Sequence, residues 1–192
     1  MGVSVKSTSS RSCQRAFRGE VLYFTPKNAK NGRFSHGFEI PQSGIMEVSM
    51  RIYETNREEE TFEIGRKLGE EAEKGQIFTL IGDLGVGKTV FTKGVAAGLG
   101  IREPVNSPTF TIVQVYEEGR LPFYHFDVYR ISDVEEMEEI GYEDYFYGEG
   151  VCMIEWADLI RELLPEKFLQ ITIEKDLQKG FDYRKIIWQE IG

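Results

Sequence analysis

The residues that most directly suggest chemistry form one segment, residues 82–89, which reads GDLGVGKT. It matches the pattern G-x-x-x-x-G-K-[ST] at every constrained position, and loops of this kind bind nucleotide phosphates. Glycines let the backbone wrap the phosphates with its N–H groups pointing inward, the lysine reaches the β- and γ-phosphates, and the threonine hydroxyl binds magnesium. We therefore expect Mg²⁺ and a nucleoside triphosphate here, in contact with Gly82, Asp83, Leu84, Gly85, Val86, Gly87, Lys88, Thr89 and Val90.

Such a loop needs a strand before it and a helix after it, and the flanking sequence predicts both. Gln76–Ile81 is a short apolar run that is typical of a buried strand. The helix expected from Lys88 ends near Leu99, where Gly98 and Gly100 terminate it. This context argues against a glycine-rich turn that matches the pattern by chance.

Phosphoryl transfer also needs a carboxylate that orients the metal, at the end of a strand beside the loop. Glu155 ends the apolar run Val151–Ile154, which suits a strand covered on both faces. Asp127 ends the run Leu121–Phe126, in which two polar aromatic residues suggest a half-exposed strand. Glu155 is therefore preferred as the metal ligand with Thr89. Asp127 then orients the attacking water, clamps a switch segment, or simply caps the following turn.

A second group of candidates lies near these carboxylates. Ser107-Pro108-Thr109 follows the loop's helix, and its hydroxyls suit either a switch segment that contacts the γ-phosphate or an ordinary turn. Lys88, Asp127 and Thr109 are thus the candidate catalytic residues. Arg130 suits either charge stabilisation or an ion pair with the acids at 133–139.

Two aromatic neighbours complete the candidate site. His125 is expected to be a packed or hydrogen-bonded histidine rather than a general base. Trp156 directly follows Glu155 and suits a core position or an exposed partner anchor, of which we favour the functional position.

The remaining chain alternates strands and helices, which predicts an α/β fold. The further elements expected are a strand at Arg51–Glu54, a helix at about Arg57–Lys74, a hairpin of Thr109–Tyr116 with Leu121–Phe126, a helix at about Val134–Glu139, an aromatic stretch Tyr142–Tyr147, a helical segment Leu159–Leu164, and closing strands at Leu169–Glu174 and Tyr183–Gln189. The expected architecture is a P-loop NTPase-like, three-layer sheet with helices on both faces and antiparallel additions.

The composition fits an ordinary globular protein, because 41% of the residues are hydrophobic and 12% aromatic. No apolar run approaches the roughly 20 residues that span a bilayer, and we expect a cytoplasmic protein with no membrane association. Cys13 and Cys152 form neither a disulfide framework nor a metal-ligand spacing, in keeping with a reducing compartment.

Charge divides the chain into two unequal parts. Residues 1–49 hold seven Lys or Arg against three Asp or Glu, whereas the whole chain carries a net charge of −9. The acidic body, residues 50–192, is a poor match for phosphate backbones, so we do not expect it to grip nucleic acid by itself.

We assign no function to the basic extension, residues 1–49. Its Ser- and Arg-rich start suits a transit peptide, a disordered tail, or residues upstream of a native start at Met46 or Met50. The Asn31-Gly32 turn signal between Val21–Thr25 and Phe34–Ile40 allows a short hairpin.

Four segments taken together resemble the TsaE family, formerly YjeE. They are the loop 82–89, the segment Ser107–Thr111, the pattern His125-x-Asp127-x-Tyr129-Arg130, and Glu155-Trp156 followed by Leu164-Pro165. Their order and spacing agree over residues 50–192, and the combination is far more specific than the loop alone. Residues 1–49 match nothing in that family.

The resemblance implies a small bacterial ATPase that is needed for threonylcarbamoyl-adenosine in tRNAs that read ANN codons. It implies binding to the TsaB–TsaD heterodimer, with tRNA met only indirectly through that complex, and Mg-ATP hydrolysis that resets the complex between rounds. It also implies that the stretch around Thr55, Asn56 and Thr61 holds the adenine end of ATP, that Lys88 and Thr89 bind phosphate and magnesium, that Glu155 completes the metal site, and that Asp127 serves hydrolysis or switching.

One residue departs from the family pattern. Many relatives have a second threonine after the magnesium threonine, whereas this chain has Val90. The loss of one neutral hydrogen bond to the α-phosphate should cost about 0.5–1.5 kcal/mol of binding free energy.

The acids at Asp133–Asp144 suit either a docking face for basic partner surfaces or a solvated helix.

Two other functions use the same loop. A small-molecule kinase would need a lid and an acceptor pocket, and neither is evident between Thr111 and Gly192. A nucleotide-gated binding module with negligible turnover would use ATP only to select a conformation.

Overall fold

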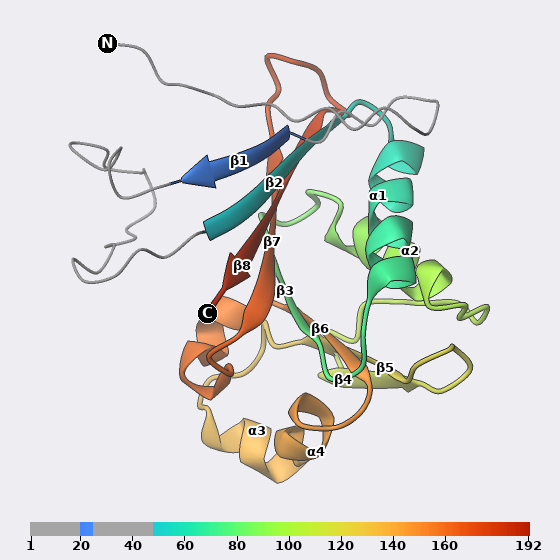
Figure 1. Ribbon diagram of the computed structural model, residues 1–192. Coiled ribbons are helices and arrows are strands. Elements are labelled where there is room, and N and C mark those ends of the chain that lie inside the picture. Colours follow the sequence, from blue (N-terminus) through green and yellow to red (C-terminus); the bar gives the residue numbers. More distant parts are fainter. Residues whose placement is uncertain (1–19, 25–47) are drawn as a thin grey trace.

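The protein is built around one mixed β-sheet (Figure 1). This computed structural model describes residues 20–24 and 48–192. The strands lie in the order β1-β2-β8-β7-β3-β6-β5-β4. Their bounds are β1 Glu20–Phe24, β2 Val48–Thr55, β3 Ile77–Ile81, β4 Val113–Tyr116, β5 Phe123–Asp127, β6 Val151–Glu155, β7 Phe168–Lys175 and β8 Arg184–Ile191.

The centre of the sheet is parallel. β3 pairs in parallel with β6 and β7, and β6 pairs in parallel with β5, whereas the outer pairs are antiparallel. β6 reads VCMIE and is buried throughout, as expected for a strand with helices on both faces. Because parallel strands run the same way, the carboxyl ends of β3, β6 and β5 meet at one edge of the sheet. The loop 82–87, Glu155 and Asp127 all lie at that edge.

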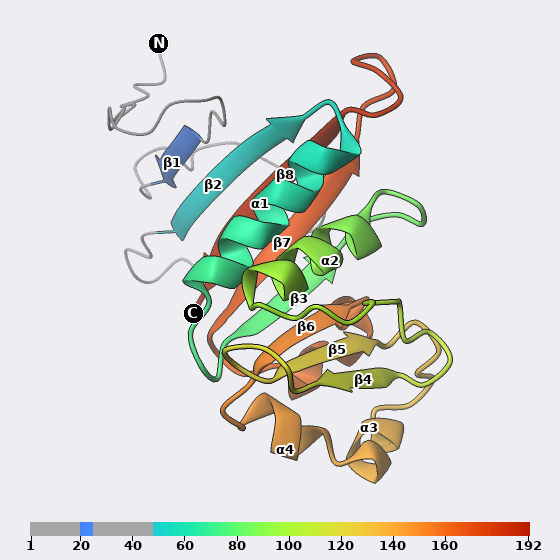
Figure 2. The ribbon, with the colours of Figure 1, turned by 90° about the vertical axis from the view of Figure 1, so that its right-hand side faces the viewer.

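Two helices cover one face of the sheet, α1 (Glu58–Glu71) and α2 (Lys88–Gly98) (Figure 2). They approach closely because glycines face each other's backbone. A Cβ atom at Gly65 would lie 2.3 Å from the carbonyl oxygen of Phe91, and one at Gly94 would lie 2.2 Å from that of Phe62. The core beneath them includes Phe78, Leu80, Phe91, Val95, Ile171 and Trp188.

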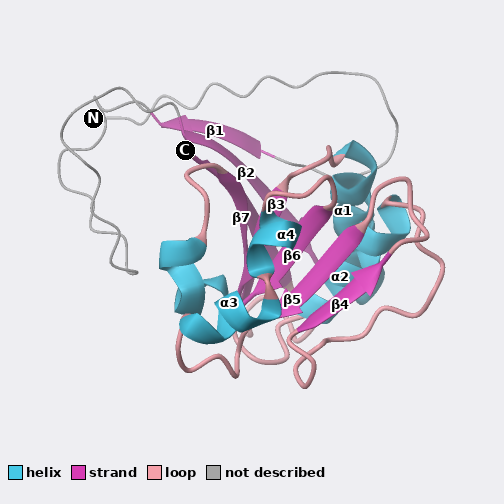
Figure 3. Ribbon diagram, turned by 90° about the horizontal axis from the view of Figure 1, so that it is seen from below, coloured by secondary structure: helices cyan, strands magenta, loops and turns pink. Residues whose placement is uncertain are grey.

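The opposite face carries α3 (Glu135–Ile140), α4 (Tyr142–Phe146) and the 3₁₀ helix η2 (Ala157–Leu163) (Figure 3). A second core joins them to the sheet and includes Phe126, Met137, Phe146, Ile154 and Ile160. The three-layer α/β arrangement expected from the sequence is therefore confirmed. Within the described ranges, no helix has the length and apolarity needed to cross a membrane.

The strand expected at Thr109–Tyr116 is wrong in its first half, because β4 begins only at Val113. The backbone N–H groups of Thr111 and Ile112 both donate to the carbonyl oxygen of Pro108, at 2.9 and 2.7 Å. Ile112 also has a φ of 64°, which is incompatible with a strand. The rigid proline thus starts a turn, and this turn leaves Thr109 free to meet Asp127.

The N-terminal extension contributes one described strand. β1 pairs antiparallel with β2, with Glu20 opposite Ile52 and Phe24 opposite Val48. The other half of the expected hairpin, Phe34–Ile40 with the Asn31-Gly32 turn, lies outside the described residues. Part of residues 1–49 therefore forms one edge of the sheet, four strands away from β3.

Candidate functional site

The loop between β3 and α2 depends on glycine at two positions. Gly87 has a φ of 108°, in the left-handed region that other residues rarely adopt. A Cβ atom at Gly82 would lie 2.6 Å from the carbonyl oxygen of Ile173 and 2.8 Å from Cγ1 of Val86. Asp83, Leu84 and Gly85 are exposed to solvent. The loop is thus anchored at its base and open at its tip, as a cradle for phosphates requires.

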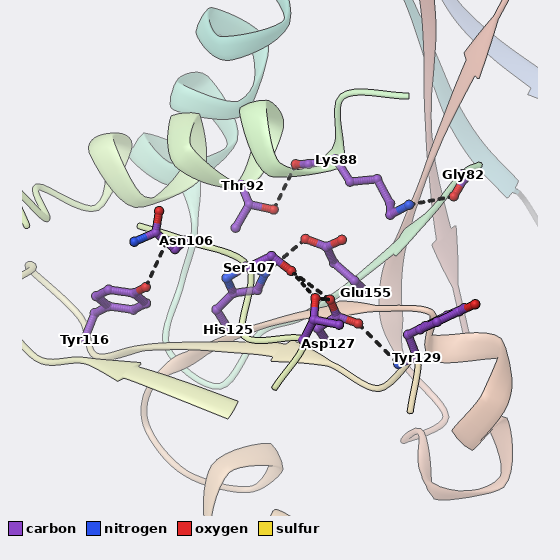
Figure 4. A network of polar contacts seen from close by, with 11 residues as sticks. Gly82, Lys88, Thr92, Asn106, Ser107, Tyr116, His125, Asp127, Tyr129 and Glu155 are labelled. Carbon is purple, nitrogen blue, oxygen red and sulfur yellow. Dashed lines mark hydrogen bonds and ion pairs between the residues drawn. The ribbon is translucent and has the colours of Figure 1, made fainter. Parts of the chain in front are cut away.

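Lys88 is the cation of this loop (Figure 4). Its ammonium donates to the carbonyl oxygens of Gly82 at 2.7 Å and Asp83 at 3.1 Å, and lies 4.4 Å from the centre of the Trp156 ring. Burial lowers the pKa of Lys88, and the negative charge of Glu155 opposes this shift. The site therefore holds a desolvated cation that polyphosphate oxygens would stabilise.

Asp127 and Glu155 occupy equivalent positions at the ends of β5 and β6. They are register partners on these parallel strands, and each is 3% exposed. The half-exposed strand expected before Asp127 is wrong, because β5 lies between β6 and β4 and His125 is fully buried. Burial therefore does not distinguish the two carboxylates. Their positions in the sheet do distinguish them, since β6 is the direct neighbour of β3 and β5 lies one strand farther away.

Asp127 holds the segment that follows the helix α2. Its Oδ2 accepts from the hydroxyls of Ser107 at 2.7 Å and Thr109 at 2.5 Å, and its Oδ1 accepts from the backbone N–H of Tyr129 at 3.2 Å. Both carboxylate oxygens are thus engaged by donors. This is the geometry of a clamp on the segment 107–109, one of the roles expected from the sequence.

Glu155 is bonded within the sheet instead. Its Oε1 lies 3.0 Å from Nε2 of His125, and a carboxylate can only accept, so Nε2 carries the hydrogen. His125 Nδ1 is buried without a hydrogen-bond partner among the described residues. His125 is therefore a packed, hydrogen-bonded residue, as the sequence predicted.

Aromatic side chains make further contacts just beyond the ends of β5 and β6. The ring of Tyr129 lies 5.0 Å from that of Trp156, and the guanidinium of Arg130 lies 4.5 Å from the ring centre of Phe110. Among the described residues, Arg130 forms no ion pair with the acids at 133–139. Trp156 has a left-handed φ of 62°, so the chain turns sharply directly after Glu155.

The residues expected at the adenine end make hydrogen bonds that join β2 to α1. The hydroxyls of Thr55 and Thr61 lie 2.9 Å apart and are buried, and they join the end of β2 to α1. Asn56 is exposed, and its backbone N–H donates to Glu60 at 2.8 Å. Val90 lines a groove between α1 and α2 together with Phe62.

Sequence reasoning missed Arg184, which the structure brings to the loop. Arg184 begins β8, opposite Thr55 of β2, and its Nε donates to the carbonyl oxygen of Val86 at 2.5 Å. No local motif marks this residue. The pairing of β8 with β7, and of β7 with β3, places it beside residues 82–89.

The oxygen donors at the sheet edge fit Mg²⁺. Mg²⁺ binds through one or two carboxylates, a hydroxyl, waters and the phosphates of the nucleotide, rather than through a full cage of protein ligands. The Thr89 hydroxyl and the carboxylate of Glu155 supply such donors, and the described residues contain no cluster of three or more His, Cys, Asp or Glu able to hold a metal alone. The donor set suits a metal that arrives with a nucleotide.

This fold and this loop define the P-loop class of α/β proteins, in which a central parallel strand leads through G-x-x-x-x-G-K-[ST] into a helix. Within that class, the chain belongs to the TsaE family. The family model described as "Threonylcarbamoyl adenosine biosynthesis protein TsaE" matches residues 55–186.

Individual relatives agree with this assignment. The chain is 50% identical over 140 residues to the tRNA threonylcarbamoyladenosine biosynthesis protein TsaE of Bacillus subtilis, which covers 73% of this chain and 85% of the relative. It is 44% identical over 115 residues to the TsaE protein of Treponema pallidum, covering 60% and 84%. The crystal structure of Bacillus subtilis YdiB superposes with a TM-score of 0.65 at 43% identity, covering 77% of this chain and 89% of that one.

Proposed function

We propose that this protein is a Mg²⁺-dependent ATPase in the biosynthesis of threonylcarbamoyl-adenosine in tRNA. The family and the names of its relatives support the pathway. The observation that carries the ATPase is the meeting of three groups at one edge of the sheet: the desolvated ammonium of Lys88 and the buried carboxylates of Asp127 and Glu155.

Lys88 and the loop amides bind the phosphates of ATP. The ammonium donates to two carbonyl oxygens of its own loop, and phosphate oxygens of the nucleotide would replace these acceptors. Mg²⁺ bound together with ATP would neutralise negative charge on the phosphates. Thr89 and Glu155 are the residues that would hold it, and His125 keeps one oxygen of Glu155 turned toward the interior of the sheet.

Asp127 acts on the reaction through the segment 107–109. Both of its oxygens already accept hydrogen bonds, so it serves as a clamp that sets where Ser107 and Thr109 present their hydroxyls. In this proposal Thr109 meets the γ-phosphate side of the site. ATP turnover then depends on whether this clamp is closed.

The partner of this ATPase is the TsaB–TsaD heterodimer, and hydrolysis resets that complex between rounds of modification. tRNA is met only through the complex, because the body of the chain is acidic. The exposed acids of α3 and α4, including Glu138, Glu139, Glu143 and Asp144, offer a charged surface for the partners. The proposed location is the cytoplasm, where the tRNA substrates are modified.

The decisive experiment compares ATP hydrolysis with and without purified TsaB–TsaD. We expect slow hydrolysis by the protein alone and a clear increase with the heterodimer, together with co-purification that depends on whether ATP or ADP is present. A rate that the heterodimer does not change would contradict coupling. Tight ATP binding without hydrolysis under any condition would favour a nucleotide-gated binding module.

A further inference from the structure

Arg184 connects the C-terminal hairpin of β7 and β8 to the phosphate-binding loop. Its Nε donates to the carbonyl oxygen of Val86 at 2.5 Å. Its Nη1 donates to the carbonyl oxygens of Phe181 at 2.9 Å and Tyr183 at 2.8 Å. The guanidinium thus bridges two backbone segments that lie almost a hundred residues apart in the sequence.

The bond to Val86 controls the direction of one amide of the loop. The structure contains no cis peptide bond among its described residues. In a planar trans peptide the C=O and the following N–H point in opposite directions. When Arg184 holds the carbonyl of Val86, the N–H of Gly87 must therefore point away from Arg184. A loop that binds phosphate needs its N–H groups directed at the ligand and its carbonyls directed away from it.

We propose that Arg184 is a positioning residue of the nucleotide site, which orients the Val86–Gly87 peptide so that the Gly87 N–H is presented to a nucleotide phosphate. This inference rests on the proposed nucleotide binding. A loop peptide can rotate as a unit, and Gly87 is especially free to do so because glycine tolerates many φ values. A charged donor on the carbonyl removes that freedom.

The surroundings of Arg184 make it a rigid support. β8 lies between β2 and β7, so the backbone of Arg184 is held by strands on both sides. The side chain also lies directly against Gly87, because a Cβ atom there would be 3.7 Å from Nε of Arg184. A second effect follows from charge, since a guanidinium group adds positive potential beside the loop.

Two variants separate the hydrogen bond from the charge. Arg184→Gln places an amide nitrogen at the position of Nε and keeps the donor without the charge, whereas Arg184→Met keeps the length and has neither. We expect Arg184→Met to bind Mg²⁺-free ADP roughly 10-fold to 100-fold more weakly than the wild type, and Arg184→Gln to recover at least about fivefold of that loss. Equal affinities for the two variants would overturn the inference.

Backbone ¹⁵N order parameters of the protein without nucleotide give a second readout, because they report directly on the freedom of the Val86–Gly87 peptide. A lower order parameter at the Gly87 amide is expected in Arg184→Met than in Arg184→Gln, with equal melting temperatures. Equal order parameters in both variants would count against a positioning role. Arg184→Leu replaces the Met variant if that variant does not fold. A wild type that binds no nucleotide would refute the proposed function, whereas a binding wild type with a normal Arg184→Met variant would refute only this inference.

Discussion

Asp127 and Glu155 lie side by side at the ends of β5 and β6, yet their hydrogen bonds lead in opposite directions. Asp127 accepts from the hydroxyls of Ser107 and Thr109, which belong to an exposed segment. Glu155 accepts from His125, which is fully buried in the sheet. One carboxylate is therefore tied to a surface segment and the other to the core, and this difference suggests separate roles in metal binding and switching.

The first prediction concerns these two carboxylates. Glu155→Ala should lower ATP turnover at least about 100-fold, because it removes the proposed ligand of the metal. Asp127→Ala should also lower turnover but leave Mg-ATP affinity within about threefold of the wild type, since its proposed role is exerted through the segment 107–109. Titration with Mg²⁺ at constant ATP measures both effects. If Asp127→Ala abolished metal-dependent binding and Glu155→Ala did not, the two roles would be reversed.

The second prediction follows from the lowered pKa of Lys88. Phosphates bind the charged ammonium of Lys88. Nucleotide affinity is therefore highest while Lys88 is protonated before binding, and the affinity decreases as the pH rises through the pKa of Lys88. Because burial holds this pKa below the ordinary value of 10.5, the decrease should begin at a lower pH than for an exposed lysine. Affinity for Mg²⁺-free ADP, measured from about pH 7.5 to about pH 10, tests this.

Lys88→Arg is the matched control for the pH experiment. Its guanidinium keeps its charge over the whole range, so its affinity should be weaker but independent of pH. A parallel decrease in Lys88→Arg would show that another group titrates.

The third prediction concerns the contact between α1 and α2. Gly94→Ala should destabilise the protein by about 1–3 kcal/mol, because the new methyl group would overlap the carbonyl oxygen of Phe62. Gly65→Ala should behave alike, since its methyl group meets the carbonyl of Phe91. Urea unfolding measures the change. Lys93→Ala, on the exposed side of α2, should change stability by no more than about 0.5 kcal/mol.

The fourth prediction concerns the N-terminal extension. Deletion of residues 1–45 should leave nucleotide affinity unchanged, because β1 is the outermost strand and three strands separate it from β3. The deletion exposes the edge of β2 and should lower the melting temperature only slightly. Calorimetry and nucleotide titration of the shortened chain test this. Failure of the shortened chain to fold would show that the extension belongs to the core.

The sequence alone predicted the parts of the site that are continuous in the chain. Residues 82–89 can be recognised from their own spacing. Glu155 can be recognised because it ends an apolar run that is typical of a central strand. The burial of β5 could not be predicted, because polar side chains such as Tyr124 and His125 are typical of a half-exposed strand. Only the hydrogen bond to Glu155 accounts for a buried histidine at this position. Arg184 could not be predicted for another reason. Its position depends on strand pairing, which no local sequence pattern indicates.

The position of β8 has a consequence for the order in which the protein can be assembled during synthesis. β8 separates β2 from the rest of the sheet, and Thr55 of β2 pairs with Arg184 of β8. On the ribosome, β2 and its neighbour β1 emerge long before β8, and they cannot join the rest of the sheet until β8 is translated. The loop 82–89 therefore emerges early but gains its support from Arg184 late. A nascent chain that stops short of Arg184 should carry the complete motif and still bind nucleotide poorly.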